Sequence, residues 1–178
     1  MYLCINIAYS LKLKEYPLVD VLILMLGYLI RLEYGGLLIG TGVSAWMFLT
    51  VTASAFFLGF GKRRNELLLY GNGSRKNLKM YTVEFLDQAC QMPMTTAIVF
   101  YALSCADTNT VVADAGVDLL WSVPLAFIIC FKYLMDLHRN DCDGDPVEVV
   151  LKDKWLVILC AAFAVVLFIL LYWQGRFF

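Results

Sequence analysis

The chain has 178 residues, of which 61% are hydrophobic and only 16% are charged, and its formal net charge is −1. Soluble domains carry about 25% charged residues, so this composition argues against an ordinary soluble protein. The nearly balanced charge says little about partners, and no nucleic-acid partner is expected.

Three long runs of the sequence carry no charged residue, at residues 37–61, 88–106 and 155–173. A membrane-spanning helix needs about 20 mostly apolar residues, and in lipid every backbone amide must be paired within the chain. The sequence therefore predicts an all-α polytopic transmembrane helical bundle; the alternative is an unusually apolar soluble core. The five spans are predicted at residues 16–32, 45–60, 81–105, 119–137 and 155–173.

The loops between these spans alternate in charge. Basic residues gather before the first span at residues 12–14, and again in the loops 61–79 and 138–154, whereas the loop 106–118 contains aspartates and no basic residue. Because basic loops of membrane proteins stay in the cytoplasm, the three basic segments are predicted to be cytoplasmic. The C-terminus then falls on the outer side.

Asp20 lies near the start of the first predicted span, shortly after Pro17. Proline suits the first turn of a helix, and an acidic side chain there complements the positive end of the helix dipole. A functional role has equal weight, because ionisable residues within a membrane usually face the interior of the bundle. Both interpretations stay open.

The second charged cluster follows the second predicted span and contains Lys62, Arg63, Arg64 and Glu66. The spacing lets both Lys62 and Arg63 meet Glu66 on a helical turn. Three adjacent cations at a helix end could bind a phosphate or a diphosphate. The alternative is that they only mark the cytoplasmic side, as most such loops do.

A stripe of polar side chains is predicted where the third span enters the membrane. Such a stripe would be costly against lipid, so we expect it to face a wet cavity or to form hydrogen bonds between helices. Its members, at helical spacing, are Tyr81, Glu84, Asp87, Gln88 and Gln91. Near the end of the fourth span, Lys132 and Asp136 are four residues apart, which predicts a structural salt bridge.

Four short segments occur in a fixed order along the chain: N-x-x-Y-S-x-x-L-K at residues 6–14, G-K-R-x-x-E-L at 61–67, Y-T-x-x-F-L-D at 81–87 and G-D-P-V-E-x-x-L-K-D at 144–153. In this order and between spans of this kind, they resemble the UbiA-type intramembrane prenyltransferase superfamily. Within it the similarity is to the branch of decaprenyl-phosphate phosphoribosyltransferases. The resemblance covers nearly the whole chain.

The resemblance implies about nine spanning helices, of which this chain would hold the last five. Residues 1–178 would then form the C-terminal portion of one UbiA-like membrane domain. The superfamily's aspartate-rich motif, N-D-x-x-D, binds Mg²⁺ and a diphosphate, and it is absent from this sequence. We therefore expect no metal ligands in this chain and no activity from it alone, with the Mg²⁺ motif in an earlier half.

The activity that the resemblance implies is transfer of 5-phosphoribosyl from phosphoribosyl diphosphate to a polyprenyl phosphate such as decaprenyl phosphate. It also implies Mg²⁺ as cofactor and the bacterial inner membrane as location, with the active-site loops in the cytoplasm. Carried over by motif position, the expected catalytic residues are Asp20 and Glu66. The expected substrate-binding residues are Tyr9, Ser10, Lys14, Lys62 and Arg63.

Two alternatives to this function stay open. The first is a prenyltransferase of the same superfamily that moves a polyprenyl chain from its diphosphate to an aromatic ring. The turn at residues 61–66 argues against it, because that subclass would carry aspartates there. The second is a membrane fragment or scaffold without catalytic activity.

Overall fold

The structure is a computed structural model that describes residues 16–40, 42–71, 76–107, 119–138 and 150–173. Within these residues every regular element is a helix, so the predicted all-α fold is confirmed. The long helices are α2 (Val19–Ile39), α3 (Ala45–Tyr70), α4 (Val83–Ala106), α6 (Val123–His138) and α8 (Lys154–Trp173). Two short 3₁₀ helices, η3 (Lys76–Met80) and η5 (Leu120–Ser122), precede α4 and α6.

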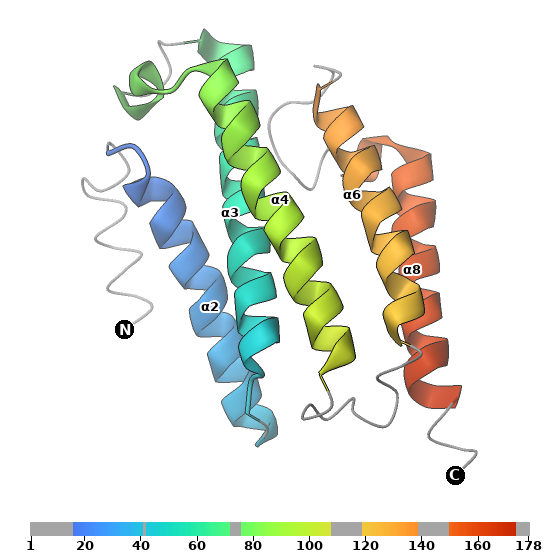
Figure 1. The fold of residues 1–178 in the computed structure, drawn as a ribbon. Coiled ribbons are helices and arrows are strands. Elements are labelled where there is room, and N and C mark those ends of the chain that lie inside the picture. Colours follow the sequence, from blue (N-terminus) through green and yellow to red (C-terminus); the bar gives the residue numbers. More distant parts are fainter. Residues whose placement is uncertain (1–15, 41, 72–75, 108–118, 139–149, 174–178) are drawn as a thin grey trace.

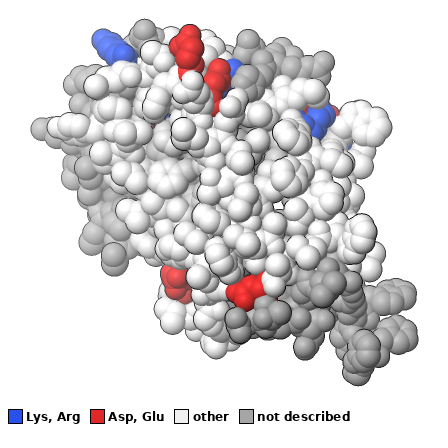
Figure 2. All heavy atoms as spheres, in the orientation of Figure 1, with Lys and Arg blue, Asp and Glu red and all other residues white. Residues whose placement is uncertain are grey.

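Four helical segments are long and apolar enough to cross a membrane: α2, α3, α4 and Leu120–Leu137. The fifth predicted span is also helical, but its described apolar part, Lys154–Leu170, is shorter than the other four. On the face that Figure 2 shows, charged side chains of the described residues lie at the two ends of the bundle and an uncharged belt lies between them. The chain is therefore an integral membrane protein.

The long helices lie side by side and alternate in direction (Figure 1). As a result α2, α4 and α8 begin at the same end of the bundle at which α3 and α6 finish. We call this the charged end, because it contains Asp20, Arg63, Arg64, Glu66 and Asp87. The predicted alternation of the spans is thus present in the fold.

Two helix ends differ from the sequence prediction. α2 runs to Ile39 instead of residue 32, and Gly40 then ends it with φ 74° in the left-handed region that glycine adopts easily. α3 runs to Tyr70 instead of residue 60, so Lys62 and Glu66 lie inside a helix and not in a loop. Both predictions stopped where charged residues begin, although such residues form good helices beyond the apolar belt.

The helices share an apolar core below the charged end. One cluster joins four of them through Phe57 of α3, Cys90 and Met94 of α4, Tyr133 of α6 and Leu156 of α8. The rings of Phe57 and Tyr133 meet edge to face, with their centroids 5.2 Å apart. This core fixes the rotation of α3, and that rotation decides which of its charged residues point inward.

Candidate functional site

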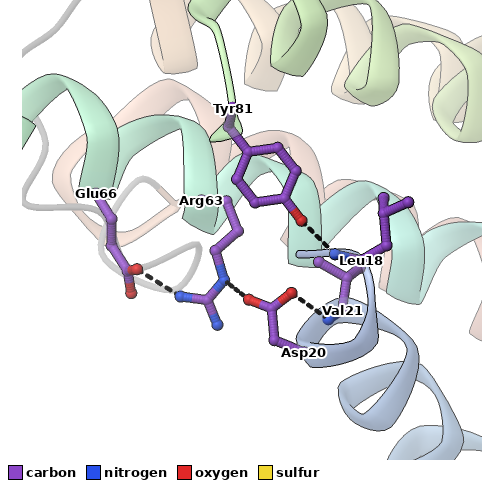
Figure 3. A network of polar contacts seen from close by, with 6 residues as sticks. All are labelled: Leu18, Asp20, Val21, Arg63, Glu66 and Tyr81. Atoms are coloured by element: carbon purple, nitrogen blue, oxygen red, sulfur yellow. Dashed lines mark hydrogen bonds and ion pairs between the residues drawn. The ribbon is translucent and has the colours of Figure 1, made fainter. Parts of the chain in front are cut away.

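Three charged side chains form a buried ionic cluster at the charged end (Figure 3). Arg63 Nε lies 2.5 Å from Asp20 Oδ2, and Arg63 Nη1 lies 2.5 Å from Glu66 Oε2. The side chains of Arg63 and Asp20 are only 1% and 0% exposed. Because an isolated charge is very costly to bury, the two carboxylates and the guanidinium stabilise one another.

The cluster combines one local pair with one long-range pair. Arg63 and Glu66 are three residues apart on α3, and their predicted contact is confirmed. Asp20 comes from the first turn of α2, where its Oδ1 also accepts a hydrogen bond from the backbone N–H of Val21 at 2.9 Å. Asp20 therefore fits both interpretations of the sequence: it binds the backbone at the start of a helix, and it lies in the candidate site.

A glycine allows α2 to approach α3 closely enough for this ion pair. A Cβ atom added at Gly59 would lie only 2.8 Å from Cγ1 of Val21, a residue that is fully buried. Gly59 is one helical turn before Arg63, and Val21 follows Asp20 directly. The absence of a side chain at Gly59 therefore sets the distance between the helices at the level of the ionic cluster.

Tyr81 connects the cluster to the start of α4. Its hydroxyl oxygen accepts a hydrogen bond of 2.6 Å from the backbone N–H of Leu18, beside Asp20 (Figure 3). Leu18 has φ 66°, which is unusual for a leucine, and this hydrogen bond helps to hold it there. Burial raises the pKa of Tyr81, and the negative charge of Asp20 raises it further, so the hydroxyl stays protonated at neutral pH.

Arg64, the neighbour of Arg63, joins three helices. Its Nε forms an ion pair with Asp87 of α4, and its Nη1 donates a 3.0 Å hydrogen bond to the carbonyl oxygen of Leu137 near the end of α6. A cation at a helix C-terminus pairs well with carbonyl groups that have no partner within the helix. Sequence reasoning treated Arg64 only as a third cation, and the acidic Asp87 was the one signal that could have indicated its partner.

The predicted polar stripe on α4 does not act as one unit. Tyr81 is buried at the cluster, Asp87 binds Arg64, and Gln88 lines an apolar cavity between α3 and α4. Glu84 and Gln91 are exposed. The expected hydrogen bonding to other helices is therefore present, among the described residues, at Tyr81 and Asp87.

Lys62 differs from its two neighbours. It is half-buried on α3 and forms no ion pair within the part of the chain that the structure describes, so the predicted contact with Glu66 is absent there. Arg63 and Arg64, by contrast, are neutralised by carboxylates of the protein. The charge of Lys62 is therefore available to an anion from outside the described part of the chain. The other expected substrate contacts, Tyr9, Ser10 and Lys14, lie outside the described residues.

A second ionic group lies where α6 ends and α8 begins. The predicted salt bridge between Lys132 and Asp136 is confirmed at 2.5 Å, and Lys132 also pairs with Asp153. Asp153 accepts hydrogen bonds from Lys132 and, at 2.8 Å, from the backbone N–H of Trp155. These two hydrogen bonds lower the pKa of Asp153. Lys132 therefore ties the two helices together, a structural role.

The described residues do not offer a metal site. Among them, no group of three histidine, cysteine, aspartate or glutamate side chains lies close enough to hold an ion. Asp20 and Glu66, the two carboxylates of the cluster, both face Arg63. This part of the chain can orient carboxylates and present one cation, but it does not fit Mg²⁺ by itself.

Several known proteins that are similar to this chain carry the same name. The chain is 30% identical over 165 residues to a decaprenyl-phosphate phosphoribosyltransferase of Corynebacterium glutamicum, covering 91% of this chain and 49% of that protein. Proteins with the same name from Mycolicibacterium smegmatis and Mycobacterium tuberculosis are 30% and 27% identical, again over 91% of this chain. The chain spans about half the length of these curated relatives, at 49%, 54% and 53%.

No protein-family profile matches the chain. The matches to individual relatives nevertheless confirm the resemblance that the four sequence segments indicate. The chain is homologous, over most of its length, to phosphoribosyltransferases of the UbiA superfamily. Its apolar helices agree with this similarity to membrane proteins.

Proposed function

We propose that this chain, a relative of the decaprenyl-phosphate phosphoribosyltransferases, is part of an enzyme that transfers 5-phosphoribosyl from phosphoribosyl diphosphate to a polyprenyl phosphate. The observation that carries the proposal is the buried cluster of Asp20, Arg63 and Glu66. Two of its residues, Arg63 and Glu66, belong to the G-K-R-x-x-E-L segment that the resemblance rests on, and the cluster lies at the charged end of the bundle. The proposed location is the bacterial inner membrane, with the charged end in the cytoplasm.

The reaction needs a site at the rim of a membrane. The donor is soluble and strongly anionic, whereas the acceptor has a phosphate head on a long apolar chain. Negative charge builds on the departing diphosphate, and fixed cations stabilise that charge most effectively where water is scarce. A charged end beside an uncharged belt provides both environments, and Figure 2 shows them next to each other.

Lys62 and two residues of the cluster, Arg63 and Glu66, then have distinct proposed roles. Lys62, whose charge no described carboxylate neutralises, binds a phosphate of the donor or of the acceptor. Arg63 is a positioning residue, because its guanidinium is buried between two carboxylates and orients both. Glu66 keeps Arg63 in place and is more exposed than Asp20, so it is the carboxylate nearer to the substrates.

Mg²⁺ stays an expectation that comes from the resemblance alone. When bound, it would neutralise charge on the diphosphate. Since the described residues do not form a metal site, we propose that its ligands belong to the aspartate-rich motif of an earlier half.

The test is a transfer assay in liposomes with labelled phosphoribosyl diphosphate and decaprenyl phosphate. Because the chain spans about half of its relatives, it is assayed alone and co-expressed with the unmatched half of the Corynebacterium protein. We expect transfer only from the combination, and a loss of about 100-fold with Lys62→Ala or Arg63→Ala. Lys79→Ala is the matched control, because Lys79 is an exposed lysine on the neighbouring η3.

Three results would contradict the proposal. Unchanged transfer with Lys62→Ala and Arg63→Ala would exclude the assigned roles. Prenyl transfer to an aromatic acid in place of phosphoribosyl transfer would favour the other enzyme class of the superfamily. Absence of every activity from the combination, with both halves present in the membrane, would favour the fragment or scaffold without catalytic activity.

A further inference from the structure

A cavity of about 490 Å³ lies between α3 and α4. It begins next to the charged end and extends into the apolar part of the two helices. Its lining includes Phe56 and Phe60 of α3 and Phe85, Ala89, Thr96 and Phe100 of α4. None of the lining residues is charged. The cavity is therefore an apolar groove within the belt that would face lipid.

The polar groups of the groove are mostly satisfied by the helices themselves. The hydroxyl of Thr52 donates to the carbonyl oxygen of Phe48 at 2.7 Å, and that of Thr96 donates to Met92 at 2.8 Å. Both threonines can then turn their methyl groups to the groove. Gln88 supplies the amide side chain of the lining, at the end of the groove nearer the ionic cluster.

The groove is elongated along the helices. On α3 its lining extends from Leu49 to Phe60, which corresponds to about 16 Å along the helix axis. Ala53 is the buried residue of the lining, Ala89 is half-buried, and Phe85 and Met92 are exposed. A groove with a floor of small residues and aromatic sides accommodates a chain that is thicker than a straight hydrocarbon.

One end of the groove opens beside the candidate site. Tyr81, whose hydroxyl binds the backbone next to Asp20, stacks on Phe85 with a centroid distance of 5.9 Å. Phe85 in turn meets Phe60 edge to face at 6.5 Å. A molecule in the groove would thus have its upper end within a few side chains of the ionic cluster.

The available cation at this end favours an anionic head. Lys62 lies on α3 two residues after Phe60, which lines the groove. It is half-buried and forms no ion pair within the described residues, whereas Arg63 and Arg64 are neutralised by carboxylates. An apolar chain in the groove and an acidic head at Lys62 would be recognised by the same pair of helices.

We infer that the groove between α3 and α4 binds the isoprenoid chain of a polyprenyl phosphate, with the phosphate at the basic end. This inference rests on the proposed function, because it places the acceptor of that reaction. An isoprenoid chain carries a methyl branch and a double bond in every unit, so it is bulkier than a straight acyl chain and has more surface to pack against the aromatic sides of the groove. Discrimination must come from this fit, because lipid surrounds the groove and the hydrophobic effect alone favours neither occupant.

The experiment is photo-crosslinking to the purified chain in nanodiscs, without any donor. The probe is a polyprenyl phosphate that carries a diazirine on its isoprenoid chain, and the labelled residues are mapped by mass spectrometry. Unlabelled polyprenyl phosphate, polyprenol and phosphatidic acid serve as competitors. Thr96→Phe and Ala89→Phe fill the groove, and Ala162→Phe on exposed α8 is the matched control.

We expect labels on α3 and α4, and about tenfold less labelling with Thr96→Phe and Ala89→Phe than with Ala162→Phe. Polyprenyl phosphate should compete at about tenfold lower concentration than phosphatidic acid. Equal competition by phosphatidic acid would overturn the inference, since the groove would then be an ordinary lipid contact. Equal labelling of Thr96→Phe and Ala162→Phe would also overturn it. Thr96 is exposed, so its substitution tests the groove without disturbing the core.

Failure of this inference and failure of the proposed function give different results. The crosslinking measures binding alone. If the chain binds polyprenyl phosphate in the groove but supports no transfer, the groove inference holds and the proposed function is wrong. A combination that transfers phosphoribosyl with unchanged rate after Thr96→Phe keeps the reaction and places the acceptor elsewhere.

Discussion

Asp20→Ala is the substitution that tests most directly what holds α2 to α3. Asp20 is fully buried, and its carboxylate lies 2.5 Å from Arg63, which is itself 1% exposed. Removal of one partner from a buried ion pair leaves an uncompensated charge and costs about 3–5 kcal/mol. Glu66 still pairs with Arg63, so we expect about 3 kcal/mol, the lower end of that range.

The assay is reversible unfolding in mixed micelles, followed by the loss of helical circular dichroism. The same measurement on Arg63→Met and on the double variant Asp20→Ala/Arg63→Met completes a double-mutant cycle. The double variant removes both charges, so it should be more stable than the sum of the single effects predicts, by about 2 kcal/mol or more. Asp87→Ala is a milder control, because Asp87 is 29% exposed.

Additive effects in this cycle would refute the reasoning. They would mean that Asp20 and Arg63 do not stabilise each other, and that α2 is held to α3 by apolar packing alone. A loss with Asp20→Ala no larger than that with Asp87→Ala would lead to the same conclusion.

Three further predictions concern the contacts around the cluster and at α8. Gly59→Ala should destabilise the fold by about 1–2 kcal/mol, because its new Cβ would lie 2.8 Å from Val21. Gly61→Ala is the control and should be neutral or slightly stabilising, since the nearest contact of its new Cβ is 3.7 Å. Equal unfolding midpoints for the two variants would contradict this prediction. Tyr81→Phe should cost about 1 kcal/mol and speed amide exchange at Leu18, whose N–H loses its acceptor; an unchanged exchange rate measured by mass spectrometry would exclude that role. The pKa of Asp153 lies below its ordinary value of 3.8, so this carboxylate stabilises the fold above about pH 4 and loses that effect as the pH falls. Asp153→Asn should therefore be less stable than the parent chain at pH 7, and the difference should shrink as the pH falls below about 4; a difference that does not change with pH would argue against the ion pair.

Much of the fold follows from sequence alone because it depends on local composition. Runs of apolar residues predict helices in a membrane, and the alternating charge of the loops predicts their alternating direction. The contacts between Arg63 and Glu66 and between Lys132 and Asp136 follow from helical spacing in the same way. The helix ends were less predictable, since charged residues beyond the apolar belt continue a helix as readily as they end it.

The tertiary structure alone decided which charged side chains meet across helices. Asp20 reaches Arg63 because α2 approaches α3 at Gly59, and Arg64 reaches Asp87 and the end of α6 because the shared core fixes the rotation of α3. These contacts cannot be derived from a periodic pattern in the sequence, because they depend on how two helices are rotated and spaced. The same is true of the groove, whose lining alternates between α3 and α4. The sequence by itself therefore determined a charged end on a membrane bundle, and packing determined that Arg63 is enclosed there while Lys62 stays available.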